Sequence, residues 1–183
     1  MLQNLQNFQE HDERTKLDIH LDFASKHRDD WEFIEDEMLI RNISYHLQYL
    51  DFLIQMYNTY SITLTIESLV CKNVVIEINL IIEAVLSFSV KFAEKIKRVP
   101  PSDDRISYNK LIGKAYHEHQ IISKNLWHTL HEFRKQGNYR HIQTEDVWEL
   151  EKYKIENAND AINILEKVRE ELSYYFSKFS EEK

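Results

Sequence analysis

Glycine and proline are scarce in this sequence, with two of each among 183 residues. Sheets and barrels need many turns, and turns recruit both residue types. Their scarcity argues against a β-rich fold and favours a few long helices joined by few loops.

No stretch of about 18 apolar residues exists, so we expect no membrane span. The polar start, MLQNLQNFQEHDERTK, lacks the apolar core of a signal peptide. The length fits one domain.

Cysteine is nearly absent, and the chain has no excess of positive charge. Cys71 is the single cysteine, which rules out an intrachain disulfide framework and a cysteine zinc cluster and agrees with a cytoplasmic location. The formal net charge is −8, whereas proteins that coat nucleic acid by charge alone carry a positive surface. Any contact with nucleic acid is therefore expected to be local.

Apolar residues recur at three- and four-residue steps along most of the chain, which is typical of amphipathic helices. A first long helix is predicted from Asp29 to Tyr57, with Asp29 or Asp30 as its N-cap. A second helix covers about 67–98, and its middle, VVIEINLIIEAVLSF, is apolar almost all round. Such a helix is packed on several sides. The segment VPPSDD ends it, because proline cannot continue a helix.

The second half of the chain carries the remaining helices. A helix or helix pair is predicted over 107–136, ended by Gly137-Asn138, since both residue types tolerate the left-handed conformation. The last helix is expected to start at the N-cap Thr144. One apolar stripe follows it, consisting of Val147, Leu150, Ala158, Ala161, Leu165, Val168, Leu172 and Phe179. We predict an all-α bundle of four to five helices over 29–183.

Residues 1–28 form a polar arm before this bundle. Within it KLDIHLDF alternates apolar and polar residues, which is the period of a strand, and SITLTIE at 61–67 does the same. The two segments either pair as a small ribbon or act as a partly extended arm and a helix connection. We favour the second interpretation.

Metal and cofactor chemistry find little support in the sequence. Di-metal centres in bundles need Glu-x-x-His on two helices, and this motif does not occur. His128 and His131 share a helical face and could hold a metal with outside help, but a surface or interface role is favoured. Two glycines cannot build a Gly-rich phosphate loop. We therefore predict no metal and no cofactor.

A local positive patch stands out in the acidic chain, between Lys124 and His141. Glu132 is its only acid, and its basic members are Lys124, His128, His131, Arg134, Lys135, Arg140 and His141. An arginine fork matches phosphate oxygens, and a histidine moves protons near neutral pH. With Asn138 as a hydrogen-bonding neighbour, this stretch suits a phosphodiester.

The stretch FRKQGNYRHIQTEDVWEL resembles the signature of the HEPN superfamily, an Arg followed after four to six residues by a His. Here Arg134 and His141 are separated by six residues. Lys135 departs from the polar residue, often Asn, that follows the Arg in many members. Gly137-Asn138 matches the Gly-Asn found inside the motif in some branches. The resemblance covers most of 64–179 and includes the position of the motif before the last helix.

The resemblance implies a HEPN-like bundle and a function. Many such proteins are metal-independent ribonucleases in which the Arg and the His act on the scissile phosphate, and they are typically homodimers. Several belong to toxin–antitoxin or antiphage systems and have a protein partner. One branch, with a nucleotidyltransferase-like partner, has a Tyr where Gln143 stands and is disfavoured. We expect an endoribonuclease with Arg134 and His141 as catalytic residues. Supporting residues toward RNA are Asn138, Lys135, Arg140, His131 and Glu77.

Three alternatives stay open. In the first alternative, the protein is not an enzyme but a non-catalytic HEPN module that binds a protein or a nucleotide. Arg134 would then only complement a helix C-terminus, and His141 would only cap the next turn. Glu77 lies on the apolar side of the second helix and needs a partner. It either holds Arg134 or a histidine in place, or pairs with another cation or solvent.

A second match to the motif lies in RNISYH, where Arg41-Asn42 precedes His46. It falls inside the first long helix, and residues five apart do not share a helical face. We interpret it as a coincidence, with Arg41 facing solvent and His46 partly buried.

Overall fold

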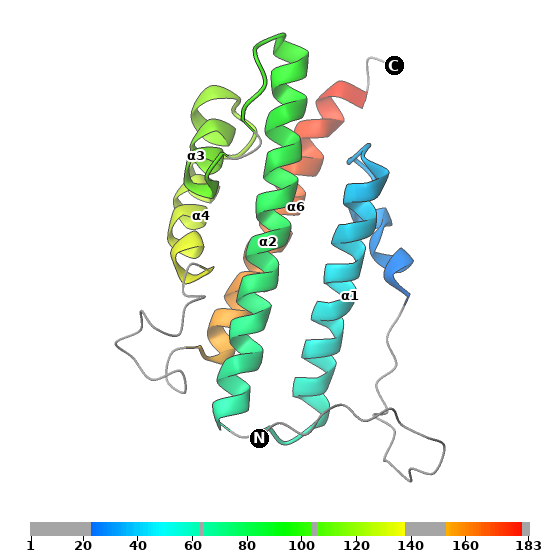
Figure 1. The fold of residues 1–183 in the computed structure, drawn as a ribbon, viewed down its shortest axis with the longest axis vertical. Helices are drawn as coiled ribbons and strands as arrows, with labels where there is room; N and C mark the ends of the chain where they lie inside the picture. Colours follow the sequence, from blue (N-terminus) through cyan, green and yellow to red (C-terminus); the bar gives the residue numbers. More distant parts are fainter. Residues whose placement is uncertain (1–22, 63, 104–105, 138–152, 181–183) are drawn as a thin grey trace.

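The computed structural model describes residues 23–62, 64–103, 106–137 and 153–180. Helices are the regular secondary structure of this part of the chain, and no strand occurs among these residues. Figure 1 shows one long central helix, α2, with α1 on one side, α3 and α4 on the other, and α6 behind it. The predicted all-α class is confirmed for the described residues.

The sequence predicts four to five helices, and the described residues contain additional short helical segments. Five α-helices occur together with three short 3₁₀ or π segments. The elements are η1 (Ala24–His27), η2 (Asp29–Trp31), α1 (Glu37–Thr59), α2 (Leu64–Lys97), α3 (Tyr108–Gly113), the π-helix η3 (Lys114–Glu118), α4 (Lys124–Gly137) and α6 (Ile155–Ser180). The predicted helix pair over 107–136 thus consists of α3 with η3, followed by α4.

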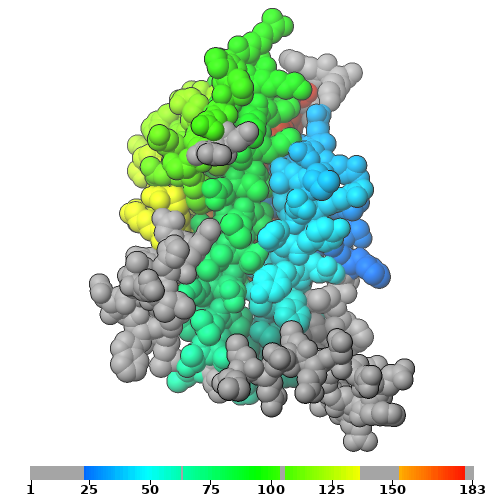
Figure 2. Space-filling view, in the orientation of Figure 1, coloured from blue at the N-terminus to red at the C-terminus, as the bar shows by residue number. Residues whose placement is uncertain are grey.

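Helix α2 forms the centre of the core. It packs against α1, α3, α4 and α6, and Val75, Ile82 and Leu86 are fully buried on it. Each such side chain contributes about 1.5–3 kcal/mol relative to an exposed one. The prediction that this apolar helix is packed on several sides is therefore confirmed. In Figure 2, α1 (blue to cyan) and α2 (green) form much of the visible face.

Helix α1 begins later than predicted. Its N-cap is Asp36, whose side chain accepts a hydrogen bond from the backbone N–H of Leu39 at 3.0 Å, so the assignment of Asp29 or Asp30 as N-cap is wrong. Residues 29–31 form a 3₁₀ turn that buries Trp31, and Ile34 is buried just after it. Since 3₁₀ and α-helices have similar side-chain periods, the apolar pattern alone does not locate the boundary.

The cap at Asp36 gives a direct test of this boundary. Asp36→Ala is expected to lower the free energy of unfolding by about 1 kcal/mol, because the cap satisfies a backbone N–H that has no partner within the helix. The matched control is Asp29→Ala, which should stay within about 0.5 kcal/mol. Urea unfolding measures both. A larger loss for Asp29→Ala would contradict the observed start of α1.

The alternating segment at 61–67 is not a strand. Leu64 and Ile66 lie in the first turns of α2, where they are exposed, so the ribbon is wrong for this segment. Residues 16–22 of the other alternating segment lie outside the described residues. In the described end of the predicted arm, η1 is attached to α1, with His27 Nε2 2.8 Å from an Asp51 carboxylate oxygen.

Helix α6 lies along α2 and buries the predicted stripe. Its described buried residues include Ala158, Ala161, Leu165, Val168 and Leu172. The sequence predicted one helix from Thr144 to the end of the chain. This is wrong, because residues 153–154 are not helical and α6 starts at Ile155; Thr144 itself lies outside the described residues. None of the described helices is both long and apolar enough to cross a bilayer.

Candidate functional site

Arg134 lies in the last turn of the described part of α4, Lys124–Gly137. The predicted break at Gly137-Asn138 is not tested, because Asn138 lies outside the described residues. The side chain is half-buried. Its Nε atom is shielded from solvent and has no hydrogen-bond partner, and the described residues form no ion pair with the guanidinium. An arginine has five N–H donors, and the one on Nε is buried without an acceptor.

One face of α4 carries aromatic and imidazole rings beside Arg134. Trp127, His131 and Arg134 are spaced at i, i+4 and i+7, which places them on the same side of the helix. The His131 ring lies 4.8 Å from the Trp127 ring, centroid to centroid, in an edge-to-face arrangement. Burial, and then the charge of Arg134, lower the pKa of His131. Near neutral pH this imidazole is therefore uncharged.

Two further groups act electrostatically in the region of Arg134: Tyr108 of α3 and Glu83 of α2. The hydroxyl of Tyr108, at the start of α3, is shielded from solvent and has no hydrogen-bond partner. Burial raises the pKa of Tyr108, Glu83 of α2 raises it further, and Arg134 opposes both. Tyr108 therefore remains a protonated donor. The electrostatic coupling shows that α2, α3 and α4 contribute charged or polar groups to one region.

The other predicted site residues are only partly placed. Lys135 is exposed, and its Nζ lies 2.8 Å from Glu132 Oε1 on the same helix. Asn138, Arg140 and His141 lie outside the described residues. Of the two residues on which the chemistry depends, the structure therefore describes Arg134 alone.

Glu77 has its partner on α1. Its Oε2 lies 2.5 Å from Nδ1 of His46, so the described contact of this carboxylate is with a histidine outside the motif and not with Arg134. His46 belongs to the RNISYH segment, and its side chain is 45% exposed, more than we expected. Arg41 is exposed, as expected, and its Nη2 lies 2.5 Å from Glu37 Oε1 one turn earlier. Both contacts stabilise α1 and its packing on α2.

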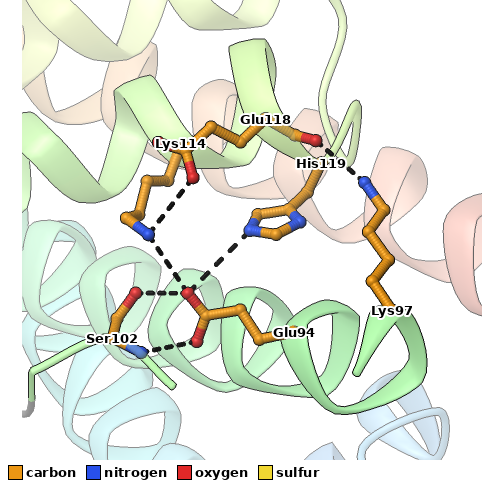
Figure 3. A network of polar contacts seen from close by, with 6 residues as sticks. All are labelled: Glu94, Lys97, Ser102, Lys114, Glu118 and His119. Carbon is orange, nitrogen blue, oxygen red and sulfur yellow. Dashed lines mark hydrogen bonds and ion pairs between the residues drawn. The ribbon is translucent and has the colours of Figure 1, made fainter. Parts of the chain in front are cut away.

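A buried polar network that the sequence did not reveal surrounds Glu94 of α2 (Figure 3). Glu94 is 1% exposed. Its carboxylate accepts a hydrogen bond from the Ser102 backbone N–H at 2.8 Å and a second from the Ser102 hydroxyl. The Nζ of Lys114 donates to the same carboxylate at 3.2 Å. These contacts fasten the residues after α2 to the helix end and tie η3 to both.

The outer part of the network carries further charges. Lys114 Nζ also lies 3.2 Å from Glu118 Oε2, and Lys97 donates to the Glu118 carbonyl at 2.8 Å. His119 is buried, with its Nε2 3.9 Å from Glu94 Oε1 and no hydrogen bond to either ring nitrogen. Burial, and then Lys97, lower the pKa of His119. This imidazole is therefore uncharged near neutral pH.

The charges of the network keep Glu94 ionised. Burial alone would raise the pKa of Glu94, but the hydrogen bonds from Ser102 and Lys114 outweigh it and hold the pKa below its ordinary value. A depression of about 420 Å³ lies beside the network and is lined by Ser102, Asp103, Ile106, Ser107, Lys110 and Lys114. Since the Glu94 carboxylate is fully engaged, we assign the network a structural role.

The position of Glu94 among apolar residues of α2 is a sequence signal for this network. Val90 and Ala93 are buried on the same helix, and a carboxylate next to such positions needs a partner. The same argument singled out Glu77 from the sequence, and it applies equally to Glu94.

Comparison of the chain with protein-family models, with curated proteins and with solved structures finds no match. The described residues contain no group of three or more His, Cys, Asp or Glu side chains placed to hold a metal ion. His128 and His131 both lie with their rings against Trp127.

Proposed function

We propose that this protein is a metal-independent endoribonuclease of the HEPN type, with Arg134 and His141 as its catalytic residues. The bundle would adopt a HEPN-like arrangement, and the protein would act as a homodimer that joins two motifs in one cleft. Toxin–antitoxin or antiphage defence, with a protein partner that restrains the activity, is the setting that the resemblance implies. RNA is the proposed substrate.

The buried Nε of Arg134, which has no hydrogen-bond partner, is the observation that supports this proposal most. The chain carries a net charge of −8, and surface arginines in such a chain readily find carboxylates. Arg134 instead ends α4 with a buried, unpaired Nε. A buried polar group without a partner is uncommon and calls for an explanation. A phosphate that binds there supplies one, because guanidinium groups match phosphate oxygens.

The proposed chemistry needs one proton carrier and one charge stabiliser. The ribose 2′-hydroxyl attacks the adjacent phosphorus and loses its proton, while the bond to the 5′-oxygen of the next nucleotide breaks and that oxygen gains a proton. The products are a 2′,3′-cyclic phosphate and a 5′-hydroxyl. His141 carries the proton, and Arg134 stabilises the charge that develops on the phosphate oxygens.

Cleavage of RNA in the presence of a chelator tests this function. Purified protein is expected to cut single-stranded or loop RNA in EDTA at the rate seen without it, and to leave 2′,3′-cyclic phosphate ends that mass spectrometry identifies. Light scattering on the same preparation is expected to give the mass of a dimer. Absence of cleavage over a panel of structured and unstructured RNAs, or a strict metal requirement, would overturn the proposal.

A non-catalytic binding module is the second candidate. The contact of Lys135 with Glu132 supports it, because this lysine stands where many HEPN ribonucleases have a polar residue after the Arg, and here its charge is paired on its own helix. RNA binding without any cleavage, or binding of a protein without RNA binding, would favour this candidate.

A further inference from the structure

The hydroxyl of Tyr108 has no role in the function proposed so far. We propose that it binds the same phosphate as Arg134, as a second hydrogen-bond donor contributed by α3. This inference rests on the proposed function, because the phosphate is that of the RNA substrate. It assigns to the site a residue that lies outside the sequence motif, 26 positions before Arg134.

Two buried donors without partners carry the inference. The Tyr108 hydroxyl and the Arg134 Nε are both shielded from solvent, and neither has a hydrogen bond. Buried donors of this kind lower stability, since the hydrogen bonds to water that they lose on folding are not replaced. The Trp127 indole N–H, on the same face of α4 as Arg134, is a third buried donor without a partner. Together they indicate a region that a ligand with acceptor atoms would complete.

The packing of the bundle brings the two donors together. Helices α3 and α4 lie side by side along the same flank of α2 (Figure 1). Tyr108 is at the first position of α3 and Arg134 is in the last turn of α4. The two helices contact each other, and the charge of Arg134 acts against the raised pKa of Tyr108.

The chemistry of the donors selects an anion. A guanidinium has only donors, and a phenol that remains protonated offers one O–H. Burial and Glu83 both raise the pKa of Tyr108, which keeps that proton in place at neutral pH. The neighbouring His131 is uncharged there, so Arg134 is the local cation. A phosphodiester, with two unesterified oxygens and one negative charge, matches one guanidinium and one hydroxyl.

The variant Tyr108→Phe tests whether the Tyr108 hydroxyl contributes to RNA binding or to the stability of the fold. The probe is a short fluorescently labelled single-stranded RNA with 2′-O-methyl groups, which cannot be cleaved, and the readouts are its Kd by anisotropy and the Tm of the free protein. We expect the Kd to rise about tenfold, because hydrogen bonds to charged groups are stronger than neutral ones. The Tm should stay unchanged or rise, since the variant removes a buried hydroxyl that has no partner.

Tyr116→Phe is the matched control. Tyr116 belongs to the adjacent η3 and packs against Trp127, yet its hydroxyl is not among the buried, unpartnered groups. This variant should leave both the Kd and the Tm unchanged. An unchanged Kd for Tyr108→Phe would overturn the inference. A fall in Tm together with weaker binding would also overturn it, by assigning the hydroxyl a structural role.

The binding assay also distinguishes this inference from the proposed activity. A wild-type protein that binds the methylated RNA but never cuts ordinary RNA would remove the endoribonuclease proposal and leave the Tyr108 site in place. A wild-type protein that does not bind the RNA at all would overturn both.

Discussion

Replacing His141 by alanine is expected to lower the rate of RNA cleavage by about two to four orders of magnitude, the usual contribution of general acid–base catalysis. The Kd for the methylated RNA should change far less, because a proton carrier acts mainly in the transition state. Single-turnover cleavage and anisotropy measure the two effects. Retained cleavage by His141→Ala would remove the catalytic assignment.

Arg134 provides the companion variants. Arg134→Ala should reduce cleavage by about two to three orders of magnitude, which is typical for the loss of one group that stabilises transition-state charge. Arg134→Lys should restore little of this rate, because an ammonium lacks the planar fork of the guanidinium. The Tm of both variants should stay close to that of the wild type, since no described hydrogen bond or ion pair is lost. A large fall in Tm would assign Arg134 a structural role instead.

Replacing Glu94 by alanine is expected to lower the free energy of unfolding by about 3 kcal/mol, the lower end of the range for a broken buried ion pair. Four contacts converge on this carboxylate, from Ser102 twice, from Lys114, and at longer range from His119. The loss is not larger because Lys114 keeps Glu118. For a chain of this length the Tm should fall by about 6–12 °C. Differential scanning calorimetry measures the change.

Glu118→Gln is the control for Glu94. Glu118 meets the same lysine, but its side chain is 54% exposed, and an exposed pair contributes about 0–1 kcal/mol. A loss as large as that of Glu94→Ala would contradict the structural role assigned to the buried carboxylate.

The effect of Glu94 should depend on pH with a defined sign. Its pKa in the folded protein lies below the ordinary value of 4.5. The stabilisation is therefore complete above about pH 4.5 and is lost as the pH falls through the lower, folded pKa. The difference in unfolding free energy between wild type and Glu94→Gln should accordingly shrink as the pH is lowered below 4.5. A difference that grows on acidification would contradict the lowered pKa.

The sequence predicted the helices well and their starts less well. The periodic apolar residues placed α2 to within one turn at each end and identified the buried stripe of α6 from Ala158 to Leu172. The start of α1 was missed because the side-chain period does not distinguish the 3₁₀ turn at Trp31 from an α-helix. The strand-like alternation at Leu64 and Ile66 was misleading because both side chains face solvent, and alternation is informative only where one face is buried.

The candidate site was predictable as a motif but not as a three-dimensional arrangement. Arg134 stood out through local charge and spacing. Tyr108 and Glu83 could not be identified from the sequence, because their relation to Arg134 arises only when α3 and α4 pack on α2. The contact between Glu77 and His46 and the network at Glu94 are likewise products of packing between distant segments. A lone acid in an apolar helix predicts that a partner exists, but the sequence does not say which one.

The central place of α2 has a consequence for biosynthesis. Helix α6 makes the most extensive contact with α2 among the described helices, yet about 60 residues separate the end of α2 from the start of α6. At about 5–20 residues per second, a ribosome needs about 3–12 s to make that interval. During this time one flank of a helix whose middle is apolar almost all round has no partner in the nascent chain. Binding of chaperones and aggregation of incomplete chains should therefore concentrate in this window.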